Sequence, residues 1–147
     1  QEVHPMRKIA YRVAVLLGAF FIAINLVWAQ KKAEANPVKK ACDGLKDSKK
    51  LVLAWFTADW CGWCTKMEKD VLGKDEVKKL MSEKFVLVKV DEADYPKLIQ
   101  EKDVHGFPVF IVYKANEEEV SRQEGACSQE VFQKFLNDAW NAEFGKK

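Results

Sequence analysis

The sequence has almost no excess of charge of either sign. Its 147 residues include 24 lysines and arginines and 22 aspartates and glutamates. Residues 1–29 hold three of the basic residues and one of the acidic residues, which leaves 21 of each sign in the rest of the chain. Lysines there are interleaved with acidic residues, as on an ordinary solvated surface, so we expect no nucleic-acid partner.

The sequence also lacks internal repeats, low-complexity segments and a cysteine at the end of the N-terminal apolar run. The last absence argues against a lipoprotein anchor. A chain of this length, with 48% hydrophobic residues, has room for one compact domain and an additional segment. The additional segment lies at the N-terminus, where residues 13–29 are almost wholly apolar.

Residues 1–29 are predicted to be a secretory signal peptide. A short basic start is followed by the apolar run, and residues 27–29 place small or modest side chains where a signal peptidase cleaves. We expect cleavage before Gln30. Residues 30–37 then form a linker, and residues 38–147 form an exported domain that is periplasmic or otherwise extracytoplasmic.

The alternative for the same segment is an uncleaved signal-anchor. If Arg12 extends its charged end to the membrane surface, residues 9–29 approach the roughly 20 residues that span a bilayer. Three basic residues lie on the leading side, so we expect the domain to be exported in either case, and in this case it stays tethered to the membrane. Gln1 to Pro5 precede a plausible initiator, Met6, and we expect no function for them.

Two of the four cysteines, Cys61 and Cys64, are separated by two residues. Such a pair can close a structural disulfide, bind a metal or exchange disulfides with another protein. Residues 51–56 read as a buried strand, and residues 65–72 have apolar residues at helical spacing. Cys61 is therefore expected near a helix N-terminus, where backbone amides and the helix dipole lower the pKa of a thiol.

The chain resembles the thioredoxin family over roughly residues 38–142. The resemblance rests on the segment ADWCGWCTKM at residues 58–67 and the segment VHGFP at residues 104–108. In the family, the second segment carries a cis-proline, here Pro108, that faces the redox pair. The resemblance implies an α/β thioredoxin fold, with a central mixed four-stranded sheet flanked by helices on both faces.

The element order read from the sequence agrees with that fold. We expect helices over residues 38–49, 61–72, 75–83, 95–102 and 128–140. We expect strands over residues 51–56, 85–90, 109–113 and 119–123. The strand at residues 85–90 is nearly continuous in apolar residues and is predicted to be covered on both faces. Ser128 is expected to cap the last helix, whose apolar stripe comprises Val131, Phe132, Phe135, Leu136 and Trp140.

The resemblance implies different roles for the two cysteines. Cys61 is the expected nucleophile, which attacks a partner's disulfide, and Cys64 resolves the mixed disulfide by attacking Cys61. This chemistry needs one exposed, acidified sulfur beside one shielded sulfur. A purely structural disulfide is the alternative for an exported protein, but it would not require the flanking aromatic and proline residues.

The active-site environment and substrate groove are expected to include Trp60, Gly62, Trp63, Phe107 and Pro108. Trp63 stands where thioredoxin itself commonly has proline, and Phe107 stands where thioredoxins usually have threonine. Trp63 is either an ordinary core residue or a partly exposed contact surface for substrate, and we favour the exposed surface.

Trp55 is the clearest departure from the thioredoxin pattern. Thioredoxins carry a buried aspartate at the matching strand position, which assists proton transfer from the second cysteine, and tryptophan cannot replace it. Asp59 and Glu68 are near in sequence but are expected to be solvated. No general base is assigned, and this departure puts efficient thioredoxin-like reduction in doubt.

The remaining thiols and histidine are expected to be peripheral. Cys42 and Cys127 could form a second disulfide, but the expected fold places their helices on opposite faces of the sheet, which favours separate thiols. His105 is the one histidine after residue 29. It is expected to face solvent, the alternative being an electrostatic effect on the thiolate.

The sequence therefore predicts an exported protein-disulfide oxidoreductase without a bound cofactor or metal, with the reductive or isomerase direction favoured. Its expected partners are proteins with disulfides or thiols and a membrane or soluble redox partner that recycles the cysteine pair. Two alternatives stay open. One is a copper- or zinc-handling module that uses Cys61 and Cys64 with His105 or Cys127, although two thiolates alone are an incomplete zinc site. The other is a non-catalytic interaction domain.

Overall fold

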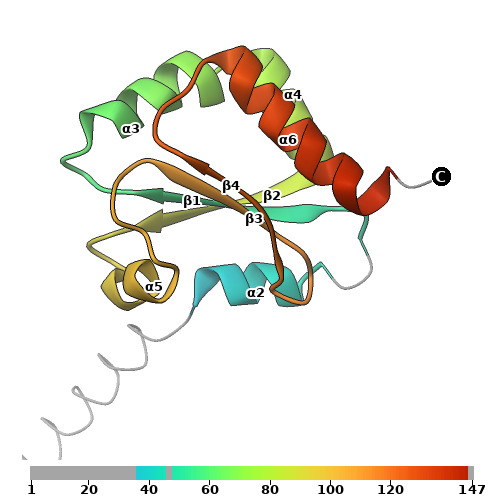
Figure 1. Cartoon of the computed structure of the whole chain (residues 1–147), viewed down its shortest axis with the longest axis horizontal. Helices are drawn as coiled ribbons and strands as arrows, with labels where there is room; N and C mark the ends of the chain where they lie inside the picture. The colour runs from blue at the N-terminus through green and yellow to red at the C-terminus, as the bar shows by residue number, and fades with distance from the viewer. Residues whose placement is uncertain (1–35, 46–47, 146–147) are drawn as a thin grey trace, which may run out of the picture. The chain divides into compact units, whose positions relative to one another are not determined.

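Four strands form one mixed sheet in the order β2-β1-β3-β4 (Figure 1). The computed structural model describes residues 36–45 and 48–145. The strands are β1 (Leu51–Thr57), β2 (Phe85–Asp91), β3 (Val109–Tyr113) and β4 (Glu119–Glu124). β1 runs parallel to β2 and antiparallel to β3, and β4 closes an antiparallel hairpin with β3. The predicted thioredoxin fold class is confirmed.

Helices cover both faces of this sheet (Figure 1). One face carries α3 (Gly62–Met67), the π-helical turn η1 (Glu68–Leu72), α4 (Asp75–Lys84) and α6 (Gln129–Phe144). The other face carries α2 (Pro37–Asp43) and α5 (Pro96–Glu101). A separate apolar cluster fills each side of the sheet, and the cluster below α3 and α6 contains Cys61 and Cys64.

β1 is buried along its whole length because it has a strand on each side and helices on each face. Its side chains alternate between the two clusters: Leu53 and Trp55 point to the cluster with the cysteines, and Ala54 points to the other. The strand ends at Thr57, directly before the turn that carries Cys61. A fully buried strand thus leads directly into the turn that carries the cysteine pair.

The first two helices differ from the sequence-based expectation. α2 begins one residue earlier than expected, since the Asn36 side chain caps it and Pro37 occupies its first turn. It ends at Asp43 rather than at residue 49, with Gly44 as its C-cap. The expected single helix at residues 61–72 changes from α to π geometry after Met67.

β2 is an edge strand whose side chains are only partly buried, so the prediction of a strand covered on both faces is wrong. Val90 is buried, whereas Leu87 is 43% exposed and Lys89 also faces solvent. The stripe of α6 also needs one correction. Ser128 caps the helix as predicted, but Val131 is 49% exposed, and Ala139 is buried in the stripe instead.

The predicted signal segment, residues 1–29, and linker residues 30–35 lie outside the residues that the structure describes. Within residues 36–45 and 48–145, none of the helices has the length and apolar character needed to cross a bilayer.

Candidate active site

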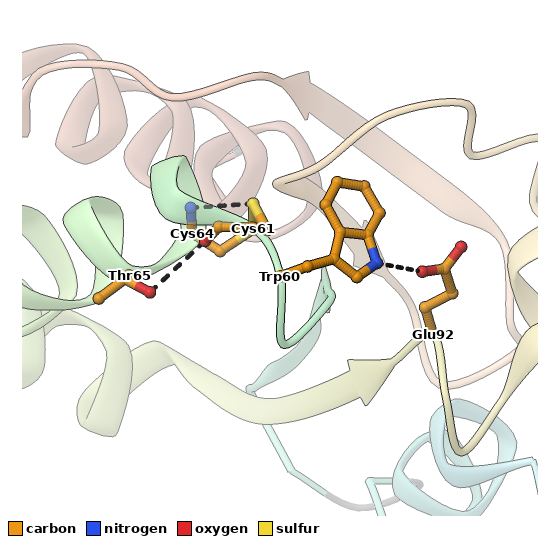
Figure 2. The surroundings of a disulfide bond; sticks show 5 residues. All are labelled: Trp60, Cys61, Cys64, Thr65 and Glu92. Atoms are coloured by element: carbon orange, nitrogen blue, oxygen red, sulfur yellow. Dashed lines mark hydrogen bonds between the residues drawn. A yellow bond between two sulfur atoms is a disulfide. The ribbon is translucent and has the colours of Figure 1, made fainter.

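Cys61 and Cys64 form a disulfide at the start of α3, with 5.3 Å between their Cα atoms. Cys61 is the N-cap of the helix, and its Sγ accepts a hydrogen bond of 3.0 Å from the backbone N–H of Cys64 (Figure 2). An amide donor at this distance also stabilises a thiolate on Cys61 once the disulfide opens. The site is thus suited to hold a thiolate on the first cysteine.

Both cysteines are nearly covered in the disulfide form. Cys61 is 5% exposed and Cys64 is 3% exposed, so the expected contrast between an exposed and a shielded cysteine is not present in this form. The two residues between them, Gly62 and Trp63, are exposed. A Cβ added at position 62 would meet no atom within 4 Å, so the surface beside Gly62 is open.

Trp60 lies on one side of the segment that carries the cysteine pair, residues 59–64, which we call the redox turn. It is 73% exposed, yet its indole N–H donates a 2.9 Å hydrogen bond to a carboxylate oxygen of Glu92, which follows β2 (Figure 2). The Phe107 ring meets the Trp60 ring edge-on, with 5.7 Å between the centroids. Glu92 was not predicted from the sequence, although the parallel pairing of β1 and β2 brings the ends of both strands together.

Replacing Glu92 with alanine is expected to release the Trp60 indole. The variant loses the acceptor of an exposed hydrogen bond, so the free energy of unfolding should fall by less than about 1 kcal/mol. The Trp60 indole N–H resonance, followed by NMR, should shift towards that of a solvent-bonded indole. Glu92→Gln keeps an acceptor oxygen and is the matched control; a resonance unchanged in Glu92→Ala would show that this bond does not hold Trp60 in solution.

The segment that carries Pro108 packs beside Trp60. The Phe107–Pro108 peptide bond is cis, and Pro108 is buried. The carbonyl of Pro108 accepts a 2.8 Å hydrogen bond from the backbone N–H of Gly125, which has a φ of +76°. Glycine adopts this φ at little cost, so the turn after β4 can approach Pro108 closely.

Trp63 is 62% exposed, so it is not a core residue. The ammonium nitrogen of Lys66, one helical turn further on, lies 5.3 Å from the centroid of the Trp63 ring. A cation at this distance is attracted to the face of the ring and keeps the indole on the surface. The preferred interpretation of Trp63, a partly exposed contact surface, agrees with this position.

Trp55 fills the strand position below the pair with an aromatic ring. It is buried, stacks on Phe110 with 6.1 Å between centroids, and lies 5.4 Å from the ammonium nitrogen of Lys89. Its indole Nε1 has no hydrogen-bond partner. Asp59 and Glu68 are exposed, as predicted. Among the residues that the structure describes, no carboxylate is buried, so no side chain here serves as a buried general base.

The other two cysteines are free thiols on opposite sides of the sheet. Cys42 is buried in the cluster below α2, and Cys127 is half-buried against the cluster that contains the disulfide. Burial raises the pKa of both thiols. The expectation of two separate thiols is confirmed.

His105 faces solvent, as expected. Its Nε2 lies 2.9 Å from a carboxylate oxygen of Asp103, and both side chains are largely exposed. Across the described part of the chain, the histidine, cysteine and acidic side chains form no cluster of three or more that could hold a metal ion. The alternative of a metal-handling module therefore has no preformed site of three or more such ligands in residues 36–45 and 48–145.

Comparisons with known proteins agree with this geometry. Residues 38–140 match the family described as a thioredoxin-like domain. The chain is 32% identical over 97 residues to the chloroplastic thioredoxin X of Arabidopsis thaliana, and the aligned region covers 65% of this chain and 52% of that protein. It is 30% identical over 131 residues to a protein disulfide-isomerase of Saccharomyces cerevisiae, and the aligned region covers 84% of this chain and 25% of the isomerase. The chain thus spans about half the length, or less, of these curated relatives.

Solved structures are similar over more of their length. A thioredoxin from Thermus thermophilus superposes with a TM-score of 0.62 at 27% identity, covering 69% of this chain and 82% of that one. The oxidised C-terminal domain of DsbD from Neisseria meningitidis superposes with a TM-score of 0.58 at 27% identity, covering 69% and 91%.

Proposed function

The chain belongs to the thioredoxin-like domain family, and from this premise we propose that it is a thiol:disulfide oxidoreductase acting on proteins through Cys61 and Cys64. The observation that carries the proposal is the disulfide itself, placed at the start of α3 with an amide N–H on the Cys61 sulfur. The thioredoxin and disulfide-isomerase relatives support the same reaction class.

The reaction follows from the positions of the two sulfurs. In the reduced protein, the Cys61 thiolate attacks one sulfur of a protein disulfide, forms a mixed disulfide and releases the other sulfur as a thiolate. Cys64 then attacks the Cys61 sulfur, which releases the second substrate thiol and closes the Cys61–Cys64 disulfide. Two electrons pass to the substrate. Cys64 is buried one helical turn from Cys61, so its ring-closing attack is intramolecular.

The favoured direction is reduction or isomerisation of substrate disulfides. It is supported by the similarity to thioredoxins, to a protein disulfide-isomerase and to the DsbD C-terminal domain. Against it stands Trp55, which replaces the buried acid of thioredoxins and leaves proton transfer from Cys64 to water or to substrate.

The reduction potential tests the direction. Equilibration with glutathione buffers, followed by acid quenching and mass spectrometry of the two thiols, should give a value nearer to the roughly −270 mV of thioredoxin than to the roughly −120 mV of DsbA. The reduced protein should also precipitate insulin by reducing its disulfides. A potential close to that of DsbA would reverse the proposed direction and make the protein an oxidant.

Export is a further part of the proposal, and it rests on the sequence alone. Residues 1–29 have the organisation of a signal peptide. Disulfide exchange with exported proteins also needs a second redox partner, soluble or in the membrane, that recycles the cysteine pair. The mass of the protein recovered from the extracytoplasmic fraction tests this part, since a cleaved form begins at Gln30. Recovery only from the cytoplasm would contradict it.

A further inference from the structure

A pocket of about 410 Å³ lies beside the redox turn. One wall comes from α3 and η1, through Trp63, Met67 and Val71, and the other comes from Ala126 and Cys127 between β4 and α6. Pockets that bind small ligands usually measure about 300–1,000 Å³. The cavity is thus large enough for a bulky side chain and open enough to receive one from the surface.

Trp63 belongs both to the pocket and to the redox turn. It lies between the two cysteines in the sequence and forms part of the pocket lining, and it is one of four large apolar side chains that are exposed among the described residues. A polypeptide joined to Cys61 by a mixed disulfide has to cross the exposed surface of this turn. Residues near the substrate's cysteine are therefore brought to the mouth of the pocket by the reaction itself.

The lining selects for an apolar occupant. Five of the nine lining residues are apolar, and the other four are Lys66, Asp70, Ser128 and Gln129. The sulfurs of Met67 and Cys127 are polarisable and adapt to irregular shapes. The charged side chains at the pocket, Lys66 and Asp70, have opposite signs, and Lys66 already lies over the Trp63 ring. The pocket therefore offers no net charge to attract an ionic group.

A second hollow, of about 190 Å³, has a different character. It lies at the Phe107 side, and Asp103, Glu124 and His105 contribute to its lining. The two hollows are close together at the end of β4. Glu124 lines the smaller hollow, and Ala126, two residues later, lines the larger one. The larger hollow has the more apolar walls of the two.

We propose that the larger pocket is a specificity site that receives an aromatic or large aliphatic side chain of the substrate polypeptide, close to the cysteine that Cys61 attacks. The inference rests on the proposed oxidoreductase function and adds to it a preference among substrates. Burial of such a side chain against Trp63, Met67 and Val71 accelerates formation of the mixed disulfide.

Disulfide-linked peptide dimers test this preference. Each peptide carries one cysteine and a phenylalanine at a single flanking position, with alanine at the other positions, and an all-alanine peptide serves as reference. The reduced full-length protein is mixed with each dimer, and the released peptide thiol is measured. The best phenylalanine peptide should react at least about tenfold faster than the reference, as expected when a hydrophobic pocket distinguishes large from small side chains.

Blocking the pocket should remove the preference. In the oxidised protein Cys61 and Cys64 are paired and Cys42 is buried, so N-ethylmaleimide should react at Cys127 alone. The reaction should become faster as the pH rises, because burial raises the pKa of the Cys127 thiol. The modified protein is then reduced and assayed, with the site confirmed by mass spectrometry. Because the label is added to folded protein, this experiment does not depend on how a variant folds.

A pair of variants gives an independent reading. Cys127→Trp places a ring in the pocket wall, while Val131→Trp places the same ring on the nearby exposed surface of α6, outside the pocket lining. The ratio of the two peptide rates should fall towards one in Cys127→Trp and in the alkylated protein, and should be retained in Val131→Trp.

The outcomes separate the two proposals. If the unmodified protein reduces both peptides at the same rate, or if the preference survives the block, the pocket is not the specificity site, although the oxidoreductase function stands. If the unmodified protein exchanges with neither peptide nor with oxidised glutathione, the proposed function fails and the specificity site fails with it.

Discussion

Replacing Cys61 with serine is expected to reduce disulfide exchange to the rate observed without protein. The hydroxyl of serine cannot form a mixed disulfide, and Cys64, which lies inside α3, lacks the N-cap position at which a backbone N–H stabilises a thiolate on Cys61. Insulin reduction, followed as turbidity with dithiothreitol as the final reductant, measures the loss. Substantial activity in Cys61→Ser would refute the assignment of Cys61 as nucleophile.

Cys64→Ser should behave differently from Cys61→Ser. The first step remains possible, but the mixed disulfide cannot be resolved from within the protein, so substrates should accumulate in covalent complexes visible on non-reducing gels. Cys42→Ala is the matched control, because Cys42 lies on the other side of the sheet in a separate cluster. It should keep its exchange activity, and trapping in Cys61→Ser rather than in Cys64→Ser would invert the two roles.

Replacing Phe132 with alanine is expected to lower the free energy of unfolding by about 3–5 kcal/mol. Phe132 is fully buried in α6, and its ring meets that of Phe110 on β3 edge-on, with 4.8 Å between centroids. The substitution removes this contact and leaves a cavity between the helix and the sheet. The loss would be a large part of the roughly 5–15 kcal/mol by which most domains are stable.

The neighbouring residue provides the control for this experiment. Val131 is 49% exposed, so Val131→Ala should change the free energy of unfolding by no more than about 0.5 kcal/mol. Urea or guanidinium unfolding, followed by circular dichroism, measures both variants. A cost below about 1 kcal/mol for Phe132→Ala would mean that α6 does not depend on this contact with the sheet.

The fold could be predicted from the sequence because its signals are local. The apolar run of β1, the capping Ser128 and the spacing of Cys61 and Cys64 each depend on a few neighbouring residues. The position of a strand within the sheet is not local. The sequence of β2 looks like that of a central strand, and only the sheet order, which places β2 at the edge, explains why Leu87 is exposed.

The parts of the candidate site that were missed depend on contacts between distant segments. Glu92 reaches Trp60 because its backbone N–H donates to the carbonyl of Thr57, which aligns the ends of β1 and β2. The pocket arises where the connection between β4 and α6 approaches the helix after the disulfide, bringing Cys127 near Trp63. Neither contact has a pattern in the sequence of either segment alone.

The full burial of β1 has a consequence for how the redox pair moves. Backbone amides in a strand that is paired on both sides and covered on both faces exchange with deuterium only when the whole domain opens. This slow-exchanging segment ends at Thr57, directly before the turn that carries Cys61. We therefore expect the nucleophile to be attached to a part of the domain that opens late, so that partial opening of the edge strands leaves its position unchanged.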